Sequence, residues 1–292
     1  MEGGEKKIYE TEQCGTLNTP DYRLYFTDER GFISPWHDIP LFADEKQKIY
    51  NMVLEIPRWS NAKMEMNTHE PLSPIMQDKS EDNVVRFVEN IFPYHGFIWN
   101  YGALPQTWED PEKAEDHTGG AGDDDPIDVI EIGSNRHRRG DIIRVKLIGA
   151  LALLSKGETD WKLITIDVDD PLANQVNTIE DVEQHFDGLL EATKHWFSIY
   201  QIPSGNPPNE IAFNGQIKDQ AFAHKVVQEA HQAWKSLVEI KNPKLNTLCR
   251  LPNAAFPLTE KECEKIVKEH DGDTIEEVAC NGQLDQYCYL KN

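Results

Sequence analysis

Four aspartates fall within the seven residues of the segment GDDDPID, from Gly122 to Asp128. The proline within it argues against a regular helix or a central strand. Like charges this close repel one another, so the segment is tolerated either because water solvates every carboxylate or because cations lie between them. An EF-hand calcium loop does not fit, because Ile127 and Asp128 stand where that pattern needs an oxygen ligand and a glycine. A solvated acidic loop and a cation site both remain open.

A second set of charges recurs at the spacing of a β-strand. Lys63 and Glu65 are two residues apart, and so are Asp160 and Lys162. Side chains two apart share one face of a strand, so each pair would project a lysine and a carboxylate together. Two surface ion pairs of little energetic value would explain this pattern. So would a site for an anion bridged by metal ions, and carboxylates clustered without His or Cys favour a hard cation, which we expect to be Mg²⁺.

Strands must carry these side chains, and the first two thirds of the chain supply strand patterns. Segments rich in β-branched and aromatic residues, bounded by Gly, Pro and Asp, cover 49–57, 129–133, 141–154 and 161–168. Their spacing suits a small closed barrel of five strands, of the oligonucleotide- and oligosaccharide-binding (OB) type. We therefore expect an α+β fold that is mainly β, with an OB-like five-stranded closed β-barrel and flanking helices.

Helix patterns follow the strands. Segment 177–186 opens with an N-cap signature at Thr178 and Asp181, and segments 188–200 and 219–239 carry apolar residues every three or four positions. From residue 242 onward the periodicity is weak. We expect a single domain over residues 1–241 and a poorly packed C-terminal extension over 242–292.

Bulk composition narrows the partners and the location. The formal net charge is −22, and duplex binding depends on Lys and Arg neutralising phosphates, so we expect no nucleic-acid partner. The basic segment NRHRRGD, 135–141, fits a solvated hairpin tip between two strands. No apolar run approaches the roughly 20 residues of a membrane span, and the first ten residues lack the apolar core of a signal peptide. We expect a cytoplasmic protein with no membrane partner, and a nuclear fraction stays open.

Several long motifs, in collinear order between Tyr22 and Glu239, resemble the soluble family I inorganic pyrophosphatases of the eukaryotic type. They are EIPRWSNAKMEM (55–66), FPYHGFIWNYGALPQTWEDP (92–111), GDDDPIDVIEIG (122–133), GETDWKLITID (157–167) and GLLEATKHWFSIY (188–200). The resemblance implies Mg²⁺-dependent hydrolysis of inorganic pyrophosphate to two phosphates, and it implies a homodimer. The extension beyond residue 241 is not covered by it.

The resemblance also implies roles for the acidic residues. Asp123, Asp128 and Asp160 would hold the tightest metal ion, with Asp128 bridging to a second. Asp125 would take the proton from the attacking water, and Glu65 would reach a further metal. A pair of cations lowers the pKa of such a water and aligns the attacking and leaving oxygens.

On the substrate side, the resemblance assigns phosphate binding to Lys63, Arg86, Lys162 and Tyr200. It places Tyr101 and Lys63 with Asp125 among the catalytic residues. Fixed positive charges act most strongly where phosphoryl charge redistributes in the transition state.

Asp124 stands where the family pattern has an asparagine, a change of small expected effect. Four other positions depart more seriously: Phe97 replaces a tyrosine, Ser155 an aspartate, and Gln201 and Asn206 two lysines. The serine should weaken a third metal site, and Lys156 could compensate as a substitute cation. A charge-assisted hydrogen bond is worth about 1.5 to 3 kcal/mol. The sequence thus favours a working but attenuated diphosphatase, with a catalytically impaired scaffold or binding protein as the alternative.

Overall fold

The computed structural model describes residues 8–80, 82–155, 157–240, 242, 244–270 and 282–290. The strands are β1 (Glu10–Cys14), β2 (Arg23–Asp28), β3 (Gly31–Ile33), β4 (Phe42–Asp44), β5 (Ile49–Ile56), β6 (Met64–Met66), β7 (Ile75–Gln77), β8 (Asn90–Ile91), β9 (Asn100–Ala103), β10 (Asp128–Glu131), β11 (Ile142–Ser155), β12 (Glu158–Asp167), β13 (Glu210–Ile211), β14 (Lys218–Asp219) and β15 (Tyr287–Cys288). The helices are α1 (Ile179–His185), α2 (Leu189–Ile199), α3 (Ala212–Gly215), α4 (Gln220–Val238) and α5 (Glu260–Lys268), with the short 3-10 helices η1 (Ile202–Ser204) and η2 (Gly282–Asp285). The mainly β prediction, with a few helices, is confirmed.

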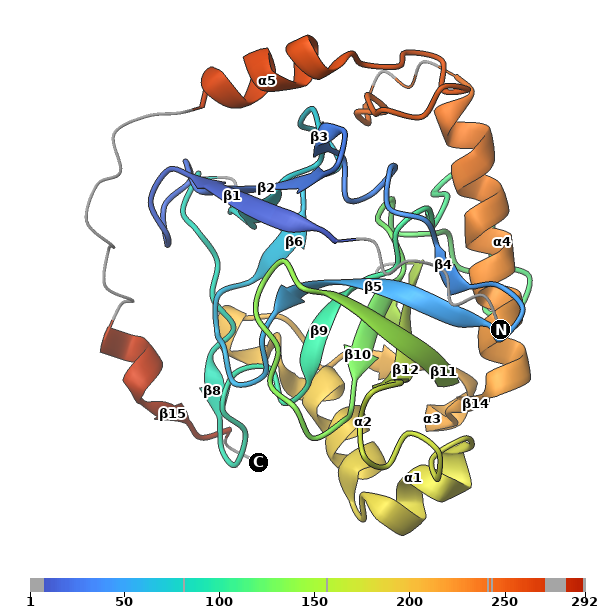
Figure 1. The fold of residues 1–292 in the computed structure, drawn as a ribbon. Helices are drawn as coiled ribbons and strands as arrows, with labels where there is room; N and C mark the ends of the chain where they lie inside the picture. The colour runs from blue at the N-terminus through green and yellow to red at the C-terminus, as the bar shows by residue number, and fades with distance from the viewer. Residues whose placement is uncertain are drawn as a thin grey trace.

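The larger sheet runs in the order β13-β11-β12-β10-β9-β5-β4 (Figure 1). Strand β5 pairs with β11 as well as with β9, so the pairing returns from β5 to β11. A smaller sheet runs β1-β2-β7-β6, with β3 also on β2. The predicted strands at 49–57, 129–133, 141–154 and 161–168 are confirmed as β5, β10, β11 and β12, because their runs of β-branched residues are buried between packed layers.

Two pairings of β12 bring the predicted charged residues together. Strand β10 lies parallel to β12, with Asp128 opposite Lys162. The hairpin of β11 and β12 sets Leu153 opposite Asp160 and Ser155 opposite Glu158. The aspartate segment therefore leads directly into a strand beside the lysine it must neutralise.

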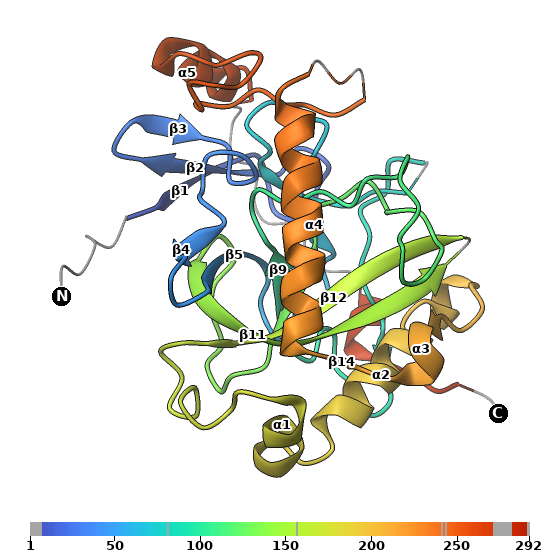
Figure 2. The ribbon, with the colours of Figure 1, turned by 90° about the vertical axis from the view of Figure 1, so that its right-hand side faces the viewer.

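Helices cover the outside of the larger sheet. The long helix α4 packs on β11 and crosses the β11–β12 hairpin (Figure 2). Its buried stripe includes Val227, Ala230 and Trp234, which recur at the predicted three- and four-residue intervals. The N-cap predicted at Thr178 is confirmed, because its side chain and that of Asp181 form a reciprocal capping box.

The described part of the C-terminal extension is packed, contrary to the poor packing expected. Helix α5 lies against β3 and buries Cys263 and Val267, which are four apart and share one face. The backbone N–H of Arg250 donates to Asp38 (2.8 Å), and its guanidinium donates to the carbonyl of Arg30 (2.8 Å). Sparse apolar residues and backbone hydrogen bonds hold this segment in place. Its packing is therefore not predicted by a strong apolar periodicity in the sequence. The domain boundary at 241/242 stays a prediction.

The basic segment 135–141 is not a hairpin tip, because β10 pairs with β12 and β9 rather than with β11. The Nε–H of Arg139 donates to the carbonyl of Glu55 (3.1 Å), and its guanidinium lies 5.7 Å from the ring centroid of Tyr22. At least one of its arginines therefore braces the fold. Among the described helices, none combines the length and apolarity that crossing a bilayer would require.

Candidate functional site

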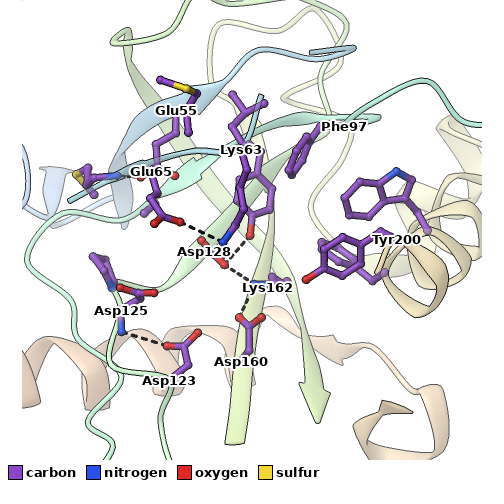
Figure 3. A pocket seen from close by; sticks show the side chains of 18 residues that line it. Glu55, Lys63, Glu65, Phe97, Asp123, Asp125, Asp128, Asp160, Lys162 and Tyr200 are labelled. Atoms are coloured by element: carbon purple, nitrogen blue, oxygen red, sulfur yellow. Dashed lines mark hydrogen bonds and ion pairs between the residues drawn. The ribbon is translucent and has the colours of Figure 1, made fainter. Parts of the chain in front are cut away.

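A cavity of about 110 Å³ opens where β5, β6, β10, β12 and α2 converge (Figure 3). Its lining includes nine of the ten residues predicted from the sequence for metal, substrate or catalysis, all except Arg86: Lys63, Glu65, Tyr101, Asp123, Asp125, Asp128, Asp160, Lys162 and Tyr200. Residues spread over 138 positions of sequence thus meet in one hollow. Buried Glu55, which also lines it, accepts a hydrogen bond from the backbone N–H of Met66 (2.7 Å).

Lys162 is the centre of the polar network in this cavity. Its ammonium donates to both Asp128 and Asp160, and the Tyr101 hydroxyl also donates to Asp128 (2.5 Å). Burial alone would lower the pKa of Lys162, but the two carboxylates outweigh burial and hold that pKa well above its usual range. The lysine is therefore a fixed positive charge.

The carboxylates around it are hard to ionise together. Burial, with Asp160 and Asp125 nearby, raises the pKa of Asp123 well above its usual range. Burial and neighbouring acids raise the pKa of Asp125 to about 8, and burial raises that of Asp160 to about 6 despite Lys162. Acids that outnumber the lysines in this way are a donor set that suits additional cations.

Three of the acidic side chains lie close to one another. Among the described residues, Glu109, Asp123 and Asp160 can each offer a carboxylate oxygen so that all three lie within 4.8 Å of one another. Glu109 is buried; its Oε1 accepts the backbone N–H of Trp161 (3.1 Å), while its Oε2 has no hydrogen-bond partner among the described residues. Asp128, the third residue of the predicted trio, is joined to Asp160 through Lys162 instead.

Glu109 was missed in the sequence analysis although it stands in the quoted motif TWEDP. Its place between a tryptophan and a turn that contains proline favours a buried position, and this is the sequence feature that points to Glu109. Its buried, unpaired oxygen beside two aspartates makes it a further oxygen donor for a cation.

Lys63 lies on the side of the cavity nearest Asp78. Its ammonium donates to Asp78 (2.8 Å) and lies 3.2 Å from Glu65. Arg86, outside the cavity lining, donates to the same oxygen of Asp78 (2.5 Å), and its side chain is 45% exposed. Asp78 thus links the two cations, a role that the sequence does not predict because no motif ties Asp78 to Lys63.

The four departing positions are distributed unevenly. Phe97 lines the cavity, with its ring centroid 5.0 Å from that of Tyr101. Gln201 donates to the Tyr200 hydroxyl (2.8 Å), and the backbone N–H of Asn206 donates to the carbonyl of Gln201 (3.3 Å). Ser155 ends β11 and is half-buried. Lys156, the suggested compensating cation, lies outside the described residues.

This arrangement can bind cations and an anion side by side. Carboxylate oxygens of Asp123, Asp160 and Glu109 lie close to one another, and the cavity beside them is also lined by Lys63 and Lys162. An anion there would meet fixed positive charge, and cations among the carboxylates would reverse the acidic sign of the remaining wall.

Comparison with known proteins agrees with this geometry. A family model described as inorganic pyrophosphatase matches residues 52–235. Inorganic pyrophosphatase 1 of Caenorhabditis elegans is 53% identical over 258 residues, which are 88% of this chain and 60% of that protein, so the chain spans less than two thirds of its length. Inorganic pyrophosphatase of Drosophila melanogaster is 49% identical over 98% of this chain and 86% of its own. The inorganic pyrophosphatase structure from Schistosoma japonicum superposes with a TM-score of 0.91 at 38% identity, covering 96% of this chain and 100% of the other.

Proposed function

Because this chain belongs to the inorganic pyrophosphatase family, we propose that it hydrolyses inorganic pyrophosphate to two phosphates with the help of Mg²⁺. The observation that carries the proposal is the meeting of six carboxylates and two lysines at one cavity. Pyrophosphate is a compact anion with phosphoryl oxygens at both ends, and such an anion needs fixed positive charge beside a cation site.

The residues present fit a hard divalent cation. The donors are all carboxylate oxygens, and one of them, Oε2 of Glu109, is buried without a partner among the described residues. Asp123, Asp128 and Asp160 would hold the tightest ion, with Glu109 as a further donor and Glu65 near another ion. When bound, Mg²⁺ polarises phosphoryl oxygens and lowers the pKa of the attacking water.

The chain's own side chains bind the substrate and move the proton. Lys162, Lys63 and Arg86 neutralise phosphoryl oxygens, and the hydroxyls of Tyr200 and Tyr101 orient the bound groups. The Asp125 carboxylate accepts the proton of the attacking water, because burial among other acids raises its affinity for a proton. Release of that proton with product resets the site.

Turnover should be lower than in relatives that carry the family residues at the four departing positions. Each missing charged or hydroxyl group removes part of the stabilisation of phosphate or metal. Hydrolysis is favoured over a non-catalytic scaffold because the metal-binding acids, the base and both lysines still gather at one cavity.

Finer features of the architecture are part of the same proposal. The return of pairing from β5 to β11 supports a closed, OB-like barrel of five strands.

A cytoplasmic homodimer is proposed from the family resemblance, and the exposed aromatic rings of Phe92, Tyr287 and Tyr289 offer an apolar surface for a second copy. Light scattering after size-exclusion chromatography gives the mass; a monomer at working concentration would refute the dimer.

Phosphate release from pyrophosphate with excess Mg²⁺ tests the activity. Asp125→Asn should lower turnover by about a hundredfold or more, since a general base contributes at least that much. Asp124→Asn is the matched control: Asp124 itself has φ +72°, which asparagine tolerates, and an amide oxygen can still accept the Trp108 N–H (3.0 Å). Wild-type release no faster than that of Asp125→Asn would refute hydrolysis.

A further inference from the structure

The aromatic ring of Tyr200 is held on two sides. Tyr200 caps the C-terminus of α2, and its ring stacks on that of Trp196 with centroids 4.8 Å apart and planes 7° apart. The ring of Phe197 meets it edge-on at 6.2 Å and 88°. A phenol fixed in this way keeps its oxygen in place, so the remaining freedom of the hydroxyl is rotation of its proton about the C–O bond.

The neighbouring residue restricts that rotation. The side-chain amide of Gln201 donates from Nε2 to the Tyr200 hydroxyl oxygen at 2.8 Å. A hydroxyl has one proton to donate and lone pairs to accept, so the direction taken by the amide hydrogen is closed to the hydroxyl's own proton. The other direction faces the cavity, where the oxygen of Tyr200 points toward Lys162 (Figure 3).

We propose that Gln201 is a positioning residue, which keeps the Tyr200 hydroxyl turned as a donor toward a phosphate oxygen bound beside Lys162. The inference rests on the proposed function, because it requires a phosphate in this cavity. It gives a role to a position at which this chain lacks the lysine of the family pattern. Gln201 supplies no charge here; it sets the direction of a neighbour's hydrogen bond.

Direct contact between Gln201 and the substrate is the competing explanation. Tyr200 is among the described residues that line the cavity, whereas Gln201 is not, and its amide is already engaged by the tyrosine. The effect of Gln201 should therefore pass through the Tyr200 hydroxyl and vanish when that hydroxyl is removed.

A double-mutant cycle separates the two explanations. Gln201→Met keeps the length of the side chain and removes its donor, and Tyr200→Phe removes the hydroxyl while keeping the ring. With Tyr200 present, Gln201→Met should lower kcat/KM for pyrophosphate about three- to tenfold, and Tyr200→Phe about tenfold. In the Tyr200→Phe background, Gln201→Met should change kcat/KM by less than about twofold. Gln228→Met, on the exposed face of α4, is the matched control and should leave kcat/KM unchanged.

Two results would overturn the inference: losses that multiply in the double variant, or a Tyr200→Phe loss without any Gln201→Met loss. Binding of the non-hydrolysable analogue imidodiphosphate with Mg²⁺, measured by calorimetry on the same four proteins, supplies a second readout. If wild-type protein bound the analogue with the expected coupling but released no phosphate from pyrophosphate, the proposed function would fail and the inference would stand. If the protein released phosphate but the kcat/KM losses of Gln201→Met and Tyr200→Phe multiplied in the double variant, the proposed function would stand and the inference would fail.

Discussion

The ammonium of Lys162 donates a hydrogen bond to Asp160, which precedes it by two residues on the same face of β12. The lysine side chain is only 3% exposed. Strand β10 brings Asp128 to the same ammonium from the other side. The acidic site therefore contains a built-in cation, and removing it would leave two partly buried carboxylates that either take up protons or need metal ions.

Lys162→Met should destabilise the metal-free protein and make its stability depend on Mg²⁺. Removing one partner of a fully buried ion pair costs about 3 to 5 kcal/mol, and the loss here should be smaller because Asp128 and Asp160 keep partial contact with water. We expect a lower Tm in EDTA, and a larger rise in Tm on adding Mg²⁺ than wild type shows, since ions binding the native state stabilise it. Thermal unfolding with both additives measures this.

Lys265→Met is the control for this comparison, because its side chain is 79% exposed and its ion pair with Glu269 is long, at 3.9 Å. An exposed pair contributes about 1 kcal/mol or less. Equal Tm losses for the two variants in EDTA would show that Lys162 is no more important to the metal-free fold than a surface lysine.

Ser155→Asp should tighten the response to Mg²⁺. Ser155 and Leu153 share one face of β11, and Leu153 is opposite Asp160, so a carboxylate at position 155 would lie on the same face of the hairpin as Asp160. We expect the Mg²⁺ concentration for half-maximal phosphate release to fall about tenfold, the scale on which single groups tune metal affinity. Ser236→Asp, on the exposed face of α4, should leave it unchanged.

Glu109→Gln tests the buried acid that was not predicted from the sequence. The amide keeps an oxygen to accept the Trp161 N–H, so the local fold should hold, but it removes the negative charge beside Asp123 and Asp160. We expect the half-maximal Mg²⁺ concentration to rise about ten- to a hundredfold. Glu115→Gln, nearby and half-buried, is the control. An unchanged Mg²⁺ response in Glu109→Gln would remove Glu109 from the cation site.

The site residues that could be predicted from the sequence are close to one another along the chain, and a single strand, turn or helix end places them side by side. Asp160 and Lys162 are neighbours on one strand face, and the aspartates from 123 to 128 lead into β10 beside β12. Thr178 and Asp181 could be recognised in the same way, because a capping box is local.

The remainder depended on contacts between distant segments. Glu109 accepts a hydrogen bond from the backbone of Trp161, 52 positions away. Asp78 accepts one from Lys63, and strands β6 and β7 lie between these two residues in the sequence. Arg139 bonds to the carbonyl of Glu55 across 84 positions, so a basic run that looked solvated is partly anchored. No periodicity within a segment reports such pairings, and the packing of the extension on β3 was hidden for the same reason.

The buried side chain of His37 predicts how stability depends on pH. The indole N–H of Trp234 on α4 donates to its Nδ1 (2.9 Å), and its Nε2 lies 3.1 Å from the carbonyl of Asn246 in the extension. With Nδ1 accepting, the neutral ring carries its proton on Nε2 and donates it to that carbonyl. A second proton on Nδ1 would break the bond to Trp234, and burial lowers the pKa of His37 from 6.5 to about 4.

Because this native-state pKa lies below that of the unfolded chain, the unfolded chain binds more protons between pH 4 and 6.5. The stability from neutral His37 is thus fully present above pH 6.5 and is lost as pH falls toward 4. Between pH 7.5 and 5 the loss should be about 2 kcal/mol. His37→Gln keeps an acceptor and a donor but cannot titrate, so its free energy of unfolding in urea should fall by about 2 kcal/mol less than that of wild type over this interval. Parallel losses in the two proteins would mean that His37 is not the group whose protonation weakens the contact between α4 and the extension.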